Sequence, residues 1–326
     1  MKALIFSLLI VLPFLSISQR LINYSYLNYY TDSAVNSYLS YKGLDTNIFS
    51  SNNIESYSIT YHTTDGKGSP TVASGAVYIP IKPNCYSAPI LIYDHGTQFN
   101  LQACPSNGAY YTKGLRFSGT GFITVMPDYI GLGVNNDIQT YHHAETEAKS
   151  SIDLTRAVRE FLLIHGKIQD NKEIYITGYS QGGHAAMATN KYIQENSLID
   201  EFNVVASAPL SGAYDLSRTQ RDFVFETPYY SVPLFLPNIL IGYESVYSNL
   251  YNNYSDMFDS PYDSIYEVNV INKTTSGIFW QFNTPSNTYD FMQDSVIENM
   301  LADTFSLSHP VNLALKNNNV YDWAPQ

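Results

Sequence analysis

A serine flanked by two glycines lies where the sequence changes from a strand pattern to a helix pattern. The segment is Gly178-Tyr179-Ser180-Gln181-Gly182, a G-x-S-x-G motif. It directly follows the apolar run 173–177 and directly precedes a helical pattern over about 182–196. A tight, strained turn at this point would lift the Ser180 hydroxyl above a sheet, and bulky flanking residues would collide there. The motif therefore predicts a serine nucleophile that attacks acyl groups.

A serine nucleophile also needs donors for the tetrahedral oxyanion and a base for its proton. The backbone N–H of Gln181 is the first predicted donor. The second should come from His95-Gly96-Thr97, which directly follows the strand-like run 89–94. The sequence leaves two roles open for the His95 side chain, because only the N–H groups of this loop need to face the substrate.

No histidine is well placed to act as the base. In sites of this kind the acid and the histidine follow the serine along the chain, and only His184 and His309 do so. His184 lies in the first turn of the helix after Ser180 and cannot easily turn back, while His309 lies in a distant helical region. Asp128 and Asp215 follow strand-like runs but have no partner histidine, so we expect them to form turns or cap helices.

A metal centre is a weaker interpretation of another polar cluster. His142 and His143 lie close in sequence to Glu145 and Glu147, but no second group follows at the spacing of a zinc site. We therefore predict a hydrogen-bonded loop there, with no metal and no cofactor.

The elements that would position these residues alternate between strands and helices. Alternation at Tyr57, Ile59 and Tyr61 predicts a strand, and 73–79 is its hairpin partner, the two forming antiparallel edge strands. Four continuous apolar runs predict parallel strands that are buried on both faces: 89–93, 122–126, 173–177 and 202–206. A helix is predicted over 145–165, with Gly166 placed to end it.

The N-terminus has the pattern of a secretory signal. Lys2 precedes the apolar run 3–15, and the small residues Ser16 and Ser18 precede Gln19. The run is shorter than the ~20 residues that a bilayer span needs, so we predict cleavage after residue 18 and no stable membrane span. The protein is thus expected to be secreted or periplasmic. In such a compartment Cys85 and Cys104 raise the question of a disulfide, which the sequence leaves open.

The net charge of −12, with no cluster of Lys and Arg, argues against nucleic acid as a partner. The expected partner is a small-molecule or lipid ester, because the motifs together resemble those of a known family: the secreted α/β-hydrolase lipases and esterases, which include the fungal secretory lipases and their bacterial relatives. The matching segments, which extend from about residue 55 to the end, include HGT at 95–97, CPS at 104–106, PDYIGLG at 127–133, YHHAETEA at 141–148, GYSQGGHA at 178–185 and YDWAP at 321–325.

The resemblance implies an α/β-hydrolase fold, with a mostly parallel sheet, flanking helices and a helical cap, and with Ser180 as the nucleophile. In the family, a segment like 321–325 leads into a strand that bears the catalytic Asp, and a later strand precedes the catalytic His. We therefore expect the acid, the base and the last strands beyond residue 326, and negligible turnover for residues 1–326 alone.

The resulting prediction divides the chain into a signal peptide (1–18), a hydrolase core (19–216), a cap or lid (217–320) and the start of a return to the core (321–326). The predicted activity is cleavage of carboxylic esters through an acyl-enzyme on Ser180, with Gln181, His95, Gly96 and Thr97 around the oxyanion. Two alternatives remain open, a serine peptidase of the same fold and a non-catalytic binding protein or fragment. The oligomeric state is left undetermined.

Overall fold

The computed structural model describes residues 19–43, 52–81, 87–100, 103–227, 229–272, 284–303 and 305–325. The predicted signal peptide and Cys85 lie outside these ranges. Cys104 is described, and it carries a free and buried thiol.

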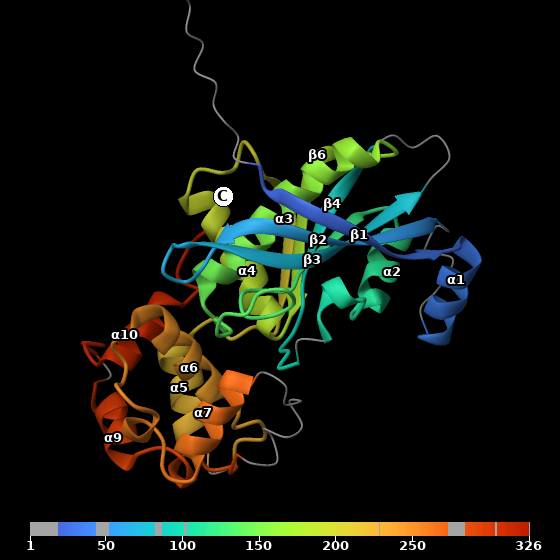
Figure 1. The fold of residues 1–326 in the computed structure, drawn as a ribbon. Coiled ribbons are helices and arrows are strands. Elements are labelled where there is room, and N and C mark those ends of the chain that lie inside the picture. Colours follow the sequence, from blue (N-terminus) through green and yellow to red (C-terminus); the bar gives the residue numbers. More distant parts are fainter. Residues whose placement is uncertain are drawn as a thin grey trace, which may run out of the picture.

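A twisted sheet of seven strands forms the centre of the described fold, in the order β1-β2-β3-β5-β4-β6-β7 (Figure 1). The strands are β1 (Leu21–Tyr30), β2 (Asn53–Thr64), β3 (Pro70–Ile81), β4 (Ser87–Asp94), β5 (Ile123–Pro127), β6 (Gln169–Tyr179) and β7 (Asn203–Leu210). β4 is parallel to both β5 and β6, and β6 is parallel to β7, whereas β1, β2 and β3 are antiparallel. Because β4 and β6 are parallel neighbours, the loops that leave their carboxyl ends meet at one edge of the sheet.

The predicted hairpin is confirmed, but its position in the sheet is not. β2 and β3 pair antiparallel along their whole length, with Tyr57 opposite Val77. They are not edge strands, because β1 pairs with the outer side of β2. Ile22, Tyr24 and Tyr26 alternate with Asn23 and Ser25, which is a strand pattern that the prediction above does not include. Apart from Leu21, the residues of β1 are exposed or half-buried.

The prediction that residues 202–206 form a strand buried on both faces was wrong. β7 pairs only with β6 among the described strands, and none of its residues is buried. Val205 is 48% exposed and Leu210 is 51% exposed. A short apolar run has the same composition in a central strand and in an edge strand, so its burial depends on neighbours that the local sequence does not specify.

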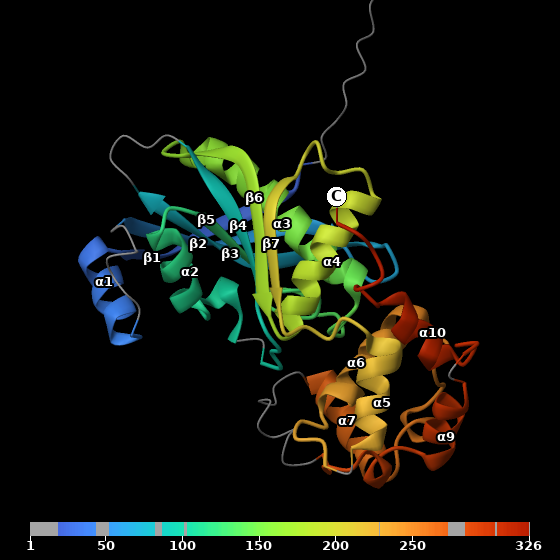
Figure 2. The same ribbon diagram turned by 180° about the vertical axis from the view of Figure 1, so that it is seen from behind.

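Helices cover both faces of the sheet (Figure 2). α3 (Ala144–His165) and α4 (Gln181–Glu195) pack on one face, and α1 (Asp32–Tyr41) and α2 (Tyr111–Gly119) pack on the other. The predicted apolar face of α3 is confirmed, since Ile152, Val158 and Leu162 are all buried. Gly166 ends α3 in a left-handed conformation, with φ of +72°, as predicted.

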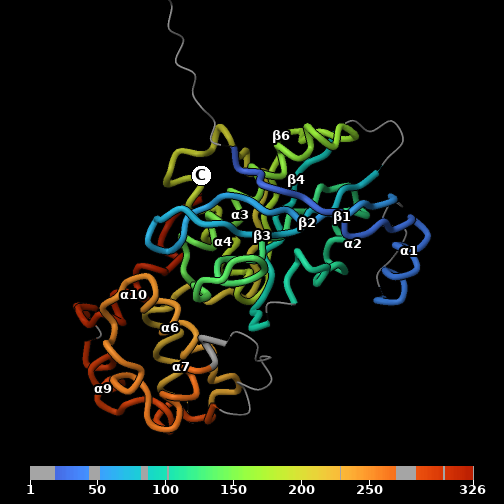
Figure 3. Tube along the Cα trace, in the orientation of Figure 1, coloured from blue at the N-terminus to red at the C-terminus, as the bar shows by residue number. Residues whose placement is uncertain are grey.

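A separate group of helices follows the sheet and forms a lobe below it in Figures 1 and 3. The helices are α5 (Arg221–Glu226), α6 (Phe235–Tyr247), α7 (Tyr262–Asn272), α9 (Asp294–Ala302) and α10 (Pro310–Asn317). They enclose their own apolar cluster, which also includes Tyr141 from the sheet part. The chain returns to the start of the lobe, where the Asn319 side chain accepts the Leu216 N–H at 2.8 Å. None of the helices that the structure describes is both long and apolar enough to cross a bilayer.

Candidate active site

Ser180 lies at the corner where β6 ends and α4 begins. Its backbone has φ of +61° and ψ of −121°, a combination that costs a non-glycine residue on the order of 1–3 kcal/mol. The corner is held by its own backbone: Ser180 N–H donates to the Leu210 carbonyl at 3.0 Å, and the Ser180 carbonyl accepts from Gly183 N–H at 2.9 Å. The Ser180 residue is half-buried at the carboxyl edge of the sheet. Strain of this kind is typical of functional sites.

The glycines of the motif allow three segments of backbone to approach each other. A Cβ atom on Gly178 would lie 2.7 Å from the Asp94 carbonyl oxygen, and one on Gly182 would lie 2.8 Å from the His95 carbonyl oxygen and closer still to that of Asp94. Real Cβ atoms do not make such contacts with backbone. The predicted collision at both flanks of Ser180 is therefore present, and it fixes α4 against the end of β4.

The loop after β4 is brought directly to this corner. A Cβ atom on Gly96 would lie 3.8 Å from the Ser180 Cβ and 3.2 Å from the Tyr179 carbonyl oxygen. Next to it, the Thr97 hydroxyl lies 2.7 Å from the Tyr141 hydroxyl, which links the loop to the helical lobe. The structure thus brings together Ser180, Gln181, Gly96 and Thr97, four residues that the sequence predicted for one site.

His95 is placed differently from its neighbours in this loop. Its ring is buried between the rings of Tyr110 and Tyr129, with centroids at 5.0 and 4.4 Å. Its Nδ1 lies 2.6 Å from the Gly96 carbonyl oxygen and its Nε2 lies 3.2 Å from that of Asp128. Burial lowers the pKa of His95, although these two carbonyl contacts act in the opposite direction. Of the two roles that the sequence left open for this ring, the geometry favours anchoring the loop.

Neither histidine after Ser180 reaches the serine hydroxyl. His184 is fully buried, with Nδ1 2.7 Å from a Glu147 carboxylate oxygen and Nε2 2.9 Å from the Asn318 carbonyl oxygen. The predicted inability of His184 to turn back is therefore explained by contacts at both ring nitrogens. His309 lies at the start of α10, where its backbone N–H donates to Asp303 at 2.6 Å. Among the described residues, no histidine side chain is hydrogen bonded to the Ser180 hydroxyl; His184 contacts Ser180 only through its backbone N–H, which donates to the Ser180 carbonyl at 3.3 Å.

Glu147 connects His184 to the start of α4. Its second oxygen accepts a hydrogen bond from the Gln181 side chain at 2.9 Å, and all three residues are almost completely buried. His142 adds its ring to this cluster, 4.8 Å from the ring of His184 between centroids. The sequence does not predict this cluster, because Glu147 lies next to His142 and His143 in the sequence, whereas its hydrogen-bond partner His184 is 37 residues away.

The same cluster has the composition of a metal site, since ligand atoms of His142, Glu147 and His184 lie within 4.8 Å of one another. Within this cluster His184 Nδ1 and a Glu147 oxygen are only 2.7 Å apart, which is a hydrogen-bond distance. A tetrahedral ion with bonds near 2.0 Å would have to separate them. We therefore assign the Glu147–His184 pair to holding the corner rather than to binding a metal.

Three aspartates, Asp94, Asp128 and Asp215, lie at or after the carboxyl ends of β4, β5 and β7. Asp94 is completely buried at the end of β4 and accepts from Ser151 at 2.6 Å; burial raises its pKa well above the usual range, and the Glu147 carboxylate adds to this. Asp128 accepts from the Ser74 hydroxyl at 2.5 Å and from the Ser106 N–H at 2.9 Å. Asp215 accepts from the Thr219 N–H and hydroxyl, in the capping role predicted for it. None of the three carboxylates is hydrogen bonded to a histidine side chain among the described residues.

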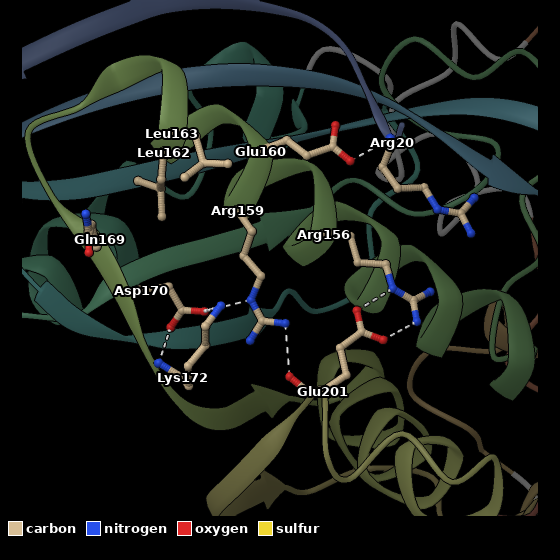
Figure 4. A pocket seen from close by; sticks show the side chains of 10 residues that line it. All are labelled: Arg20, Arg156, Arg159, Glu160, Leu162, Leu163, Gln169, Asp170, Lys172 and Glu201. Atoms are coloured by element: carbon tan, nitrogen blue, oxygen red, sulfur yellow. Dashed lines mark hydrogen bonds and ion pairs between the residues drawn. The ribbon is translucent and has the colours of Figure 1, made fainter. Parts of the chain in front are cut away.

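Another hollow in the described part of the molecule lies outside this site. It has a volume of about 800 Å³ and lies beside the amino ends of β6 and β7, away from Ser180 (Figure 4). Arg156 binds Glu201 at 2.6 Å, and Arg159 binds Asp170 at 2.7 Å, so cations and carboxylates here neutralise each other. Open sheets of this kind bind ligands at the carboxyl ends of their strands. The ion pairs that line this hollow therefore hold α3 against the amino ends of the strands, and we do not assign the hollow to the active site.

Comparison with known proteins gives a consistent picture. The rice cell wall degrading esterase LipA from Xanthomonas oryzae is 28% identical, with a TM-score of 0.82 over 94% of this chain and 80% of that one. A protein from Legionella pneumophila is 26% identical, with the same TM-score over 94% and 81%. Candida antarctica lipase A in its closed state is 14% identical, with a TM-score of 0.62 over 94% and 66%, and shows the fold alone. No curated protein sequence matches the chain.

These likenesses confirm the α/β-hydrolase fold and support ester hydrolysis as the general class of activity. A family model described as secretory lipase matches residues 115–305, which is more than half of the sequence and includes the Ser180 corner. The chain belongs to the secretory lipase family.

Proposed function

We propose that this protein is an exported serine hydrolase that cleaves carboxylic esters through an acyl-enzyme on Ser180. The observation that carries the proposal is the strained corner at Ser180, with φ of +61°, against which the backbone of Gly96 is packed. A hydroxyl on such a nucleophile elbow is free of the helix and of the sheet. The family and the similarity to an esterase favour esters over amides as the scissile group.

The proposed reaction follows from the groups around the corner. The Ser180 Oγ would attack the ester carbonyl carbon, so that a C–O bond to the enzyme forms while the ester C–O bond breaks. The hydroxyl proton of Ser180 would end on the leaving alcohol. The backbone N–H groups of Gln181 and of the 95–97 loop are the proposed donors to the oxyanion, and a water molecule would then release the acid. The loop is fixed by the His95 ring and by the Thr97 contact to Tyr141. Donors that are held in place before the reaction need no reorganisation during it.

The helical lobe is the proposed cap over this site. Its end lies next to α4, because the Asn318 carbonyl contacts the His184 ring in that helix. Its start lies beside its end, because the Leu216 N–H donates to the Asn319 side chain. Its apolar cluster includes Tyr141, which contacts the 95–97 loop. We propose that the acyl group of the ester lies between this lobe and Ser180, where apolar and aromatic side chains would exclude water.

A fluorophosphonate probe tests the nucleophile directly. We expect the probe to modify Ser180, identified by mass spectrometry of the digested protein, and to leave Ser180→Ala unmodified. Because no described histidine side chain is hydrogen bonded to the Ser180 hydroxyl, labelling should be slow, and added imidazole should accelerate it by acting as an external base. Absence of the adduct from correctly folded protein, with imidazole present, would count against a serine mechanism.

Export is the second part of the proposal, with cleavage after Ser18. The start of the mature chain would be well anchored, since the Glu160 carboxylate accepts the N–H groups of Arg20 and Leu21 at 2.8 and 2.9 Å. N-terminal sequencing of protein recovered outside the cytoplasm should begin at Gln19. Recovery of chains that still begin at Met1 would overturn the cleavage site.

A further inference from the structure

Tyr110 has a strained backbone and lies against the loop that follows β4. It directly precedes α2, with φ of +61° and ψ of +11°, a left-handed conformation that is uncommon for a residue with a side chain. Its ring stacks on the buried ring of His95, with the two centroids 5.0 Å apart. Backbone strain persists only where the surrounding contacts enforce it, and it is frequent at functional sites.

The Tyr110 hydroxyl joins two points of this loop. It accepts a hydrogen bond from the Gln98 side-chain amide at 2.8 Å, so its own proton can be donated to another group. The acceptor is the Gly96 carbonyl oxygen at 3.4 Å, and the same oxygen lies 2.6 Å from His95 Nδ1. Burial raises the pKa of Tyr110, so the phenol keeps this proton at neutral pH. Two side chains therefore hold the direction of the Gly96 carbonyl.

The direction of this carbonyl determines the direction of the next N–H. The peptide bond between Gly96 and Thr97 is trans, so its C=O and N–H point in opposite directions. The Thr97 N–H must therefore point away from the two side chains that hold the carbonyl. Among the described residues it has no hydrogen-bond partner, and the same is true of the Gly96 and Gln181 N–H groups. Donors that lack a partner beside the Ser180 corner are available to an oxyanion.

We propose that Tyr110 is a positioning residue for ester cleavage: its hydroxyl holds the Gly96 carbonyl so that the Thr97 N–H is the second oxyanion donor. The inference rests on the proposed function, because it assigns a donor for that reaction. A hydrogen bond to a carbonyl also polarises the N–H of the same peptide, which makes it a stronger donor. Tyr110 acts through this peptide and not through contact with the substrate.

The preceding peptide supplies the competing donor. The Tyr129 hydroxyl donates to the His95 carbonyl at 3.1 Å, so Tyr129 directs the Gly96 N–H in the same way. The Thr97 N–H is the better held of the two. The carbonyl of its peptide contacts two donors, and the Thr97 hydroxyl also lies 2.7 Å from that of Tyr141.

The rate at which a fluorophosphonate modifies Ser180 tests the proposal, with imidazole present as the base. The Ser180 Oγ bonds to phosphorus, fluoride leaves and imidazole takes the serine proton, while the phosphoryl oxygen occupies the oxyanion position. Tyr110→Phe keeps the ring and removes the hydroxyl. We expect the maximal rate at saturating probe to fall by about threefold to tenfold, which corresponds to one hydrogen bond between neutral groups. The probe concentration that gives half of this rate should not change, and neither should the Tm.

Tyr111→Phe is the matched control and should label at the parent rate. Tyr111 is the next residue, is 40% exposed and packs on Tyr30 and Tyr38 rather than on the loop. Tyr129→Phe separates the two peptides, and it should slow labelling less than Tyr110→Phe does.

Three results would overturn the assignment of Tyr110. They are labelling of Tyr110→Phe at the parent rate, a loss that is fully accounted for by weaker probe binding or a lower Tm, and a larger loss of rate in Tyr129→Phe. Failure of the folded parent protein to form any adduct is a different result, because it would overturn the serine mechanism and this inference with it.

Discussion

Replacing Glu147 with alanine is expected to destabilise the protein by about 2–5 kcal/mol. The substitution removes the hydrogen-bond partner of two buried groups at once, His184 Nδ1 and the Gln181 side-chain amide. Each buried donor left unsatisfied costs about 1–3 kcal/mol, and two such donors lose their acceptor here. Urea unfolding at constant pH measures the loss as a lower midpoint at an unchanged slope.

Glu145 provides the control for this experiment. It lies two residues away on the same helix, but its side chain is 55% exposed and forms an ion pair with Lys149. Glu145→Ala should therefore change the free energy of unfolding by no more than about 0.5 kcal/mol. Equal effects of the two substitutions would show that the Glu147 cluster does not hold the corner.

The Ser180 corner could be predicted from the sequence because its signals are local. The glycines, the strand before them and the helix after them all lie within a few residues, and the turn requires each of them. The 95–97 loop was also predictable, since it follows a strand of the same parallel set and such loops meet at one edge.

The hydrogen bonds that hold the Ser180 corner in place could not be predicted in the same way. The sequence shows that Glu147, His184 and Asn318 are polar, but not that they become partners across 37 and 134 residues. Nothing in the sequence indicates that Arg221 is buried, because a charged residue is ordinarily exposed even in an aromatic-rich region. Its burial follows from how the lobe packs, which is a property of tertiary structure.

Substitution of Gly182 is the sharpest test of the close packing between α4 and the end of β4. The Gly182 φ is in the ordinary helical range, so alanine would be allowed by the backbone and even favoured by about 1 kcal/mol as a helix former. The added methyl group, however, would collide with the Asp94 carbonyl group and lie 2.8 Å from the His95 oxygen. These are backbone atoms of β4 and of the 95–97 loop, and they cannot move aside as a flexible side chain can.

Gly182→Ala should therefore lower stability by at least about 3 kcal/mol, because α4 must shift away from the sheet. The matched control is Gly119→Ala in α2, where the new methyl group meets only the Val35 side chain at 3.3 Å and that of Leu39 at 3.9 Å. Thermal unfolding should give a much lower Tm for the first variant and a nearly unchanged Tm for the second. The fluorophosphonate should also label Gly182→Ala more slowly than the parent at a temperature where both are folded, since the shift moves the Gln181 N–H relative to Ser180. If Gly182→Ala unfolds and labels like the parent protein, the close approach of α4 to β4 is not what fixes the corner.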